Sequence, residues 1–233
     1  MNHERSFQRM AAITALLSAP LAFGNTLTML LALGFDVEAV MDPLALLASG
    51  PFGAEMWRWS MVLDMLGYYL LIVPLTLFLK RWLGARIPGW AELFGLGLLG
   101  YSLVGAIGAA IHTATLPPLI RAYSEAASGQ QAILRIVFLA FDDAVMVGLW
   151  NTLEMLLAST GWLGFGILLL RERRASGVIT ILLGASALTD VAGVIFGIEP
   201  LATAGLMVYI FLAPIWALWL GLDLLRRPVQ PEA

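Results

Sequence analysis

Hydrophobic and polar positions alternate along the chain in long blocks rather than residue by residue. Apolar runs recur between short polar stretches, and a helix needs roughly 20 apolar residues to cross the hydrocarbon core of a bilayer. The pattern therefore predicts an all-α membrane protein, a bundle of six transmembrane helices that makes one integral membrane domain over residues 1–233. The predicted spans are 11–33, 59–79, 91–116, 143–170, 178–198 and 201–225.

Prolines and glycines occur within the apolar runs and at their ends. Pro74 lies inside the second predicted span and should kink it, which membrane helices tolerate when neighbours satisfy the freed carbonyl. Pro117 and Pro118 are expected to end the third span, before a polar connection. Small residues let membrane helices approach closely, so the third span is expected to pack tightly inside the chain, or against a second copy or another membrane partner. Its glycines are Gly95, Gly97, Gly100, Gly105 and Gly108.

The region from Ala132 to Leu170 is too long for one span at about 1.5 Å per residue. Two short spans would place the arginines at 171–174 on the side opposite the other basic loops, against the positive-inside tendency. The sequence therefore favours a short lateral amphipathic segment, at about 131–142, before a single fourth span. Whether 131–142 lies on the membrane surface or enters the membrane stays open.

The composition supports the membrane assignment and excludes several classes of function. Hydrophobic residues make up 60% of the chain and charged residues 12%, unlike a soluble domain, in which about a quarter are charged. A net charge of -3, with basic residues near span ends, argues against binding nucleic acid. There is no cysteine and there are only two histidines, which excludes thiolate chemistry and His-rich zinc sites. No metal and no cofactor is expected.

The distribution of positive charge predicts the orientation. Of the 13 Lys and Arg residues, only Arg58, Arg121 and Arg135 fall on one side of a six-span arrangement. The others lie at the termini and in the second-to-third and fourth-to-fifth loops. By the positive-inside rule, both termini are cytoplasmic.

Polar residues inside the predicted spans are the candidates for function. Ionisable side chains deep in hydrocarbon are costly and usually mark functional sites. Asp64, Glu154 and Asp190 are the three clear cases, and helical spacing puts aromatic and polar residues on the same faces. These groups predict an outward-facing intramembrane pocket that binds a ligand. Its candidate residues are Asn25, Asp64, Tyr68, Tyr101, His112, Trp150, Asn151, Glu154 and Asp190.

More conservative interpretations stand beside this one. Polar groups in membrane bundles also hydrogen-bond helices to one another, for about 0.6 kcal/mol on average. That alternative is as well founded for Asp64 and Asp190, and it is favoured for His112 as an interfacial or structural histidine. Asp142 and Asp143 are expected to be solvated at the outer edge.

Short segments spread over the chain carry a resemblance. They are Arg9 to Ile13, Pro20 to Phe23, Arg58 to Tyr69, Gly148 to Trp150, Gly161 to Gly166 followed by Arg171, and Pro214 to Trp216. In these segments the chain resembles small bacterial six-span integral membrane proteins classed as a domain of unknown function. The resemblance implies a multi-pass protein of the bacterial inner membrane, and it implies no catalytic residues.

Three functions remain open at this point. The first is binding or transport of a small amphipathic or lipid-soluble ligand, with the carboxyls supplying charge or protonation coupling. The second is an intramembrane enzyme, in which Glu154, Asp190 or Asp64 acts as a general acid on a lipid-soluble substrate, as in a terpene cyclase or an isomerase. The third is an accessory subunit of a membrane complex.

Overall fold

A computed structural model describes residues 2–85 and 87–227, and every regular element in them is helical. Five helical stretches in this part of the chain are long and apolar enough to cross a membrane, as expected of a multi-pass membrane protein. The α-helices are α1 (Asn2–Ala32), α2 (Pro43–Leu47), α3 (Gly50–Asp64), α4 (Val73–Gly84), α5 (Pro88–Glu125), α6 (Ser128–Asp143), α7 (Met155–Glu172), α8 (Arg174–Phe196) and α9 (Glu199–Arg226). Short segments of other helix types are the 3₁₀ turns η1 (Glu38–Met41) and η3 (Leu70–Ile72), and the π-helices η2 (Met65–Tyr69) and η4 (Ala144–Glu154).

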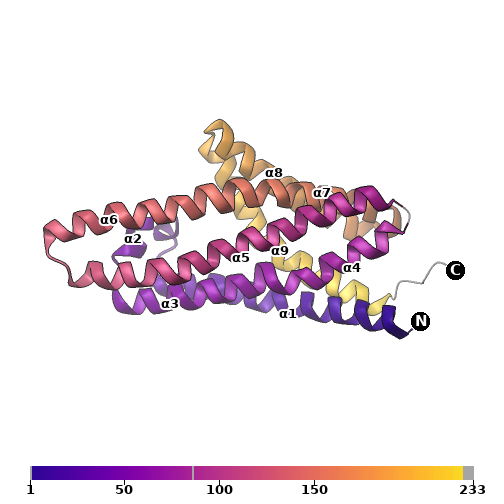
Figure 1. Ribbon diagram of the computed structural model, residues 1–233, viewed down its shortest axis with the longest axis horizontal. Helices are drawn as coiled ribbons and strands as arrows, with labels where there is room; N and C mark the ends of the chain where they lie inside the picture. The colour runs from indigo at the N-terminus through magenta and orange to yellow at the C-terminus, as the bar shows by residue number, and fades with distance from the viewer. Residues whose placement is uncertain (1, 86, 228–233) are drawn as a thin grey trace.

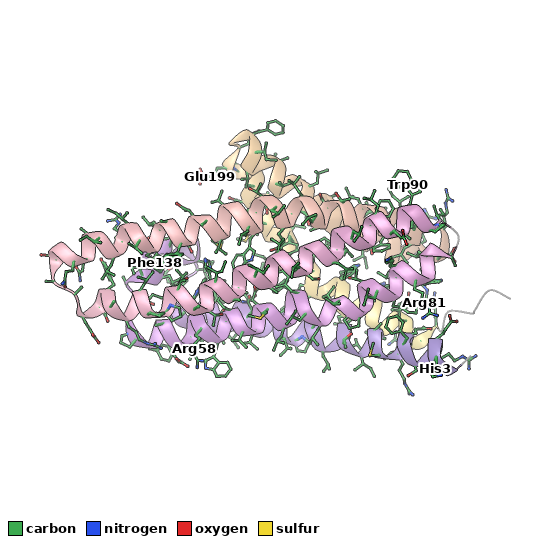
Figure 2. All side chains as sticks on the ribbon, viewed as in Figure 1. His3, Arg58, Arg81, Trp90, Phe138 and Glu199 are labelled. Atoms are coloured by element: carbon green, nitrogen blue, oxygen red, sulfur yellow. The ribbon has the colours of Figure 1, made fainter. Side chains whose placement is uncertain are left out.

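The long helices close into a ring. Each packs mainly against the next along the chain, α1 on α3, α3 on α5, α5 on α7, α7 on α8 and α8 on α9, and α9 packs back on α1. In Figure 1 the rods from α1 to α7 run along the long axis, while the α8–α9 hairpin diverges from it. Figure 2 marks the tip of that hairpin with Glu199, and places His3, Arg81 and Trp90 together at one end of the bundle.

The fifth helix does not end where the prolines predicted. α5 continues through Pro117 and Pro118 to Glu125, so the prediction that they terminate the helix is wrong. Proline already has a helical φ, and its cost is a lost hydrogen bond that tertiary packing can offset. Leu116 and Ile120, on either side of the pair, are fully buried in the packing against neighbouring helices.

The predicted lateral segment at 131–142 is also wrong as a separate element. α6 runs without a break into η4 and α7, and the three form one long rod in Figure 1. α6 packs on α2 and α5, while its Ile133 and Ile136 side chains stay exposed. Phe138 is fully buried there, between α6 and these helices, and is labelled in Figure 2. Amphipathic spacing alone cannot distinguish a helix that lies on a membrane from one that packs on its neighbours.

The second predicted span is distorted near Pro74, as expected. The chain leaves regular α-helical geometry after Asp64, passes through η2 and η3, and resumes an α-helix at Val73. Pro74 lies in the first turn of α4, where a missing N–H costs little.

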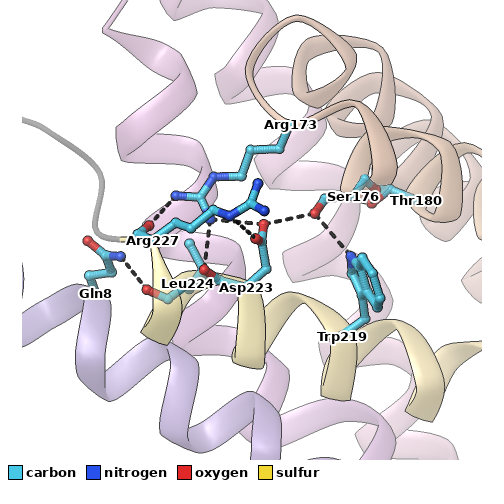
Figure 3. A network of polar contacts seen from close by, with 8 residues as sticks. All are labelled: Gln8, Arg173, Ser176, Thr180, Trp219, Asp223, Leu224 and Arg227. Atoms are coloured by element: carbon cyan, nitrogen blue, oxygen red, sulfur yellow. Dashed lines mark hydrogen bonds and ion pairs between the residues drawn. The ribbon is translucent and has the colours of Figure 1, made fainter.

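A polar network joins the helices at the end of the molecule that holds Arg81 (Figure 3). Arg173, in the α7–α8 turn, donates to the carboxylate of Asp223 on α9 at 2.9 Å, and its guanidinium stacks over Trp82 at 5.1 Å. Ser176 on α8 donates to the same carboxylate at 3.0 Å and accepts a hydrogen bond from Trp219. Arg173 and Asp223 are almost completely buried, so this pair fixes the start of α8 to the end of α9.

We predict that Arg173→Ala destabilises the folded protein by about 2–3 kcal/mol, because it leaves the buried Asp223 carboxylate without its charged donor. Thermal unfolding of the purified protein in detergent measures the effect. The neighbouring Arg174 is exposed, and Arg174→Ala should change stability by about 0.5 kcal/mol or less. Equal effects of the two substitutions would show that the network contributes nothing specific.

Candidate functional site

Three carboxyl groups are buried inside the ring of helices. Asp64 ends α3, Glu154 ends η4, and Asp190 lies in the second half of α8. Glu154 and Asp190 are fully buried and Asp64 is 8% exposed. Glu154 interacts electrostatically with both aspartates, so acids from three separate helices share one region.

The backbone is irregular beside two of these acids. Asp64 immediately precedes the π-helix η2, and Glu154 is the last residue of the longer π-helix η4. A π-turn is wider than an α-turn. The Thr152 hydroxyl illustrates this, because it donates to the carbonyl of Val147, five residues back, at 2.7 Å. Such turns are rare and occur frequently at functional sites. Both acids are thus held on backbone that differs from the α-helices around it.

Tyrosines from three helices surround the acids. The Tyr101 hydroxyl, from α5, donates to the Tyr68 carbonyl at 2.9 Å and lies 2.8 Å from the Tyr209 hydroxyl of α9. Because Tyr101 has only one hydroxyl proton, Tyr209 is the donor in the second contact. The Tyr68 hydroxyl donates in turn to the Ile210 carbonyl at 2.8 Å. These hydrogen bonds tie η2, α5 and α9 together around Glu154.

The aromatic rings of this cluster are in contact with one another. Tyr101 is central, with ring centroids 5.3 Å from Tyr69 and 4.8 Å from Trp162. Trp162 lies 5.8 Å from Tyr209 and the same distance from Trp216. Separations of 4.5–7 Å are those of favourable aromatic pairs. The acids therefore lie beside a continuous aromatic wall.

The carboxyl groups lack the partners that buried charges normally have. Neither oxygen of Glu154 or Asp190 makes a hydrogen bond of normal geometry, and the same holds for Oδ2 of Asp64. The Tyr69 and Tyr209 side chains interact with Glu154 without completing such a bond. Burying a charged group is costly unless it is paired. The site is therefore an incomplete polar cluster, the kind of exception that calls for a functional explanation.

A narrow cavity adjoins the aromatic wall. Its lining includes Ser18, Tyr68, Tyr101, Trp162 and Trp216. It has room for about one water molecule. Within the described residues, no three acidic or histidine side chains are close enough to hold a metal ion together. None of the three acids lines this cavity.

Asn25 has a different environment. Its amide Nδ2 donates to both the carbonyl and the hydroxyl of Ser60 at 3.0 Å, and the Ser60 hydroxyl donates back to the Asn25 carbonyl at 3.1 Å. These reciprocal bonds join α1 to α3. Asn25 therefore acts in the packing of helices near the site.

A second cluster lies further along α5. His112 is fully buried between Trp57 and Trp150, with ring centroids at 6.0 and 5.0 Å. Its Nε2 lies 3.7 Å from a carboxylate oxygen of Asp142, which is only 8% exposed. The prediction of a solvated Asp142 is wrong, because α6 packs on α5 in this region. The packing of His112 between two tryptophan rings fits the structural alternative that was expected for it. Asp143 is exposed, as expected.

Of the predicted site residues, Tyr101 is hydrogen-bonded to Tyr68, and Asp64 and Asp190 lie within electrostatic range of Glu154. His112 and Tyr101 are 11 residues apart on one helix, about 16 Å along its axis, so His112 and Trp150 belong to the second cluster. Asn151 is half-buried on η4. The sequence reasoning missed three aromatic residues of the first cluster: Tyr69, Trp162 and Tyr209.

A signal for these three was present in part. Tyr209 is the only tyrosine of the last span, and an aromatic hydroxyl in mid-membrane usually finds a polar partner. Tyr69 follows Tyr68 and would face another side of a regular α-helix. Only the wide turn of η2 buries both rings in the bundle.

The glycines of α5 explain how large rings fit at this depth. A side-chain carbon at Gly105 would lie 2.0 Å from the Tyr69 ring, and one at Gly108 would lie 2.3 Å from the Trp150 indole nitrogen. Gly97 and Gly100 meet α7. The Trp150 nitrogen also donates to the Gly105 carbonyl at 3.2 Å. The glycine face of α5 is therefore occupied by the protein's own helices and aromatic rings.

Comparison with known proteins adds no relative, since no family model, no curated protein and no solved structure matches the chain. The fold and the site together define a helical, multi-pass membrane protein with a buried cluster of acids and aromatic residues.

We predict that Gly105→Ala displaces the Tyr69 ring and destabilises the protein by about 1–3 kcal/mol, as overpacking of a close-packed core does. Thermal unfolding in detergent, together with near-ultraviolet circular dichroism of the aromatic residues, reports both effects. Gly129, in the first turn of α6, has open space around it and is a matched control. Gly129→Ala should leave stability unchanged or slightly raised.

Proposed function

We propose that the protein crosses the bacterial inner membrane six times, with both termini in the cytoplasm. In this arrangement the rod of α6, η4 and α7 is the fourth span in chain order, and it adds one span to the five long apolar helices. It completes the ring between α5 and α8. An even number of antiparallel spans brings the two termini to one side, and Gln8 near the start of α1 donates to the Leu224 carbonyl near the end of α9 at 2.7 Å. The excess of arginine at this end supports its cytoplasmic placement.

The absence of cysteine makes this topology directly testable. We predict that Gly129→Cys, at the α5–α6 turn, reacts with a membrane-impermeant maleimide added to intact cells. Arg174→Cys, at the α7–α8 turn, should react only after the membrane is permeabilised. Labelling of both positions from outside, or of neither, would contradict the six-span arrangement.

We further propose that the protein binds or transports a small amphipathic molecule at the cluster of Asp64, Glu154 and Asp190. The observation that carries this proposal is the fully buried Glu154 carboxyl, which has no hydrogen-bond partner and stands at the end of a π-helix. A protein that only needed to join its helices would be more stable with a paired or apolar group at this position. We therefore explain the unpaired Glu154 carboxyl by a ligand and a proton that bind to it alternately.

Opening of the site is the step that the proposal requires, because the acids are buried and the neighbouring cavity has room for little more than a water molecule. Irregular helices at membrane depth commonly line binding sites and supply the hinge for rearrangement. The segments η2 and η4 flank the acids on two sides. We propose that they move together to admit a ligand from the outer side, while the Arg173 and Asp223 pair keeps the inner end closed. A proton bound by the carboxyls couples to this exchange.

We predict that the protein, purified from its own membrane, carries a small molecule that Glu154→Gln loses by tenfold or more, about 1.4 kcal/mol. Mass spectrometry of extracts from the two proteins measures the difference. Glu125→Gln makes the same chemical change at an exposed position and should keep the molecule. Identical extracts from the wild type and Glu154→Gln would refute ligand binding at this site.

The same molecule, sealed into liposomes with the protein, separates transport from catalysis. Movement of the unchanged molecule together with protons, lost in Glu154→Gln, supports transport. Conversion to a product of different mass or structure would instead identify an intramembrane enzyme that uses Glu154 as an acid.

A further inference from the structure

The balance of hydrogen-bond donors and acceptors at the site restricts the chemistry of its ligand. Five carboxyl oxygens, on Glu154, Asp190 and Asp64, make no hydrogen bond of normal geometry, and the polar groups that interact with Glu154 are tyrosine hydroxyls. Among the described residues, no Lys, Arg or His is an interaction partner of these three groups. A carboxylate ligand or a phosphate would add negative charge to a site without a basic residue. The cluster is therefore suited to a ligand that brings positive charge.

The aromatic wall adds a second, independent restriction. The rings of Tyr69, Tyr101, Trp162 and Tyr209 form one chain of ring contacts, and Tyr69, Tyr101 and Tyr209 interact with Glu154. The faces of Trp and Tyr rings attract cations, and a cage of such rings next to an acid is a known solution for ammonium ligands. The Tyr101 and Tyr209 hydroxyls are engaged with each other. The rings offer their faces rather than free polar groups.

A hard metal ion fits these observations poorly. Metal ions such as Ca²⁺ need six or more converging oxygens, and Mg²⁺ an octahedral set. Within the described residues, the acids do not form a group that could hold a metal. An organic cation instead uses the apolar rings and needs only one nearby carboxylate for charge balance.

From these constraints we infer that the ligand of this site is a lipophilic organic cation of the ammonium type, which binds against the aromatic wall and pairs with Glu154. The inference rests on the proposed function, since it names the class of molecule that the site would take. In the absence of such a cation, protons neutralise the carboxyls, so cation and proton compete for the same groups. Binding of the cation therefore strengthens as the pH rises.

Benzyltrimethylammonium is a suitable probe, and its uncharged isostere neopentylbenzene has nearly the same shape. Isothermal titration calorimetry on the purified full-length protein in detergent should show binding of the cation, tighter at pH 8 than at pH 6. Glu154→Gln should weaken it by tenfold or more. Glu125→Gln should bind it as the wild type does.

Two substitutions at Tyr101 distinguish the contribution of its aromatic ring to binding affinity from that of its hydroxyl. Tyr101→Phe keeps the ring face and should change affinity by less than about threefold, whereas Tyr101→Leu removes the ring and should weaken binding about 10- to 30-fold. Asp190→Asn provides a second neutralised acid if Glu154→Gln does not fold. Size-exclusion chromatography and thermal unfolding establish that each variant is folded before it is titrated.

The results distinguish the two proposals. Binding of neopentylbenzene as tight as that of the cation, with both dependent on Glu154, would overturn the cationic class and leave ligand binding intact. Cation binding that is unchanged in Glu154→Gln and in Asp190→Asn would overturn the inference. The proposed function fails separately, if the extracts of wild type and Glu154→Gln carry the same molecules.

Discussion

The burial of unpaired carboxyl groups inside a ring of helices is the constraint on which the rest of this structure depends. Glu154 and Asp190 have no exposed surface and no hydrogen-bond partner. Apolar surroundings penalise the charged forms of such groups, which is why they are rare and often mark functional sites. The ring from α1 to α9 supplies those surroundings.

The two π-helices lie next to two of the buried acids. Their wide turns end or begin at Glu154 and Asp64, so the backbone that carries the acids differs from the rigid helices around it. At one end of the molecule, Arg173 and Asp223 hold α8 and α9 together. The hydrogen bonds of the Tyr101 hydroxyl join α5 to η2 and α9.

The second cluster, around His112, shows how depth along a helix separates sites. His112 and Tyr101 lie on the same helix and near the same glycine-lined face, yet they contact different partners. Trp150 stands between the clusters, with its indole nitrogen bound to the Gly105 carbonyl. The two polar clusters are thus neighbours along the bundle, and the glycines of α5 make room for the rings that link them.

The sequence alone determined the helical membrane class and three of the four buried acids of the described residues, because both follow from the free energy of placing apolar and charged groups in hydrocarbon. The fourth, Asp142, was expected to be solvated. Helix ends were not determined, since packing carried α5 past two prolines and kept α6 in line with α7. The aromatic partners Tyr69, Trp162 and Tyr209 were decided only by tertiary structure. Which face of a helix meets which neighbour depends on π-turns and glycine contacts, and these are properties of the whole bundle.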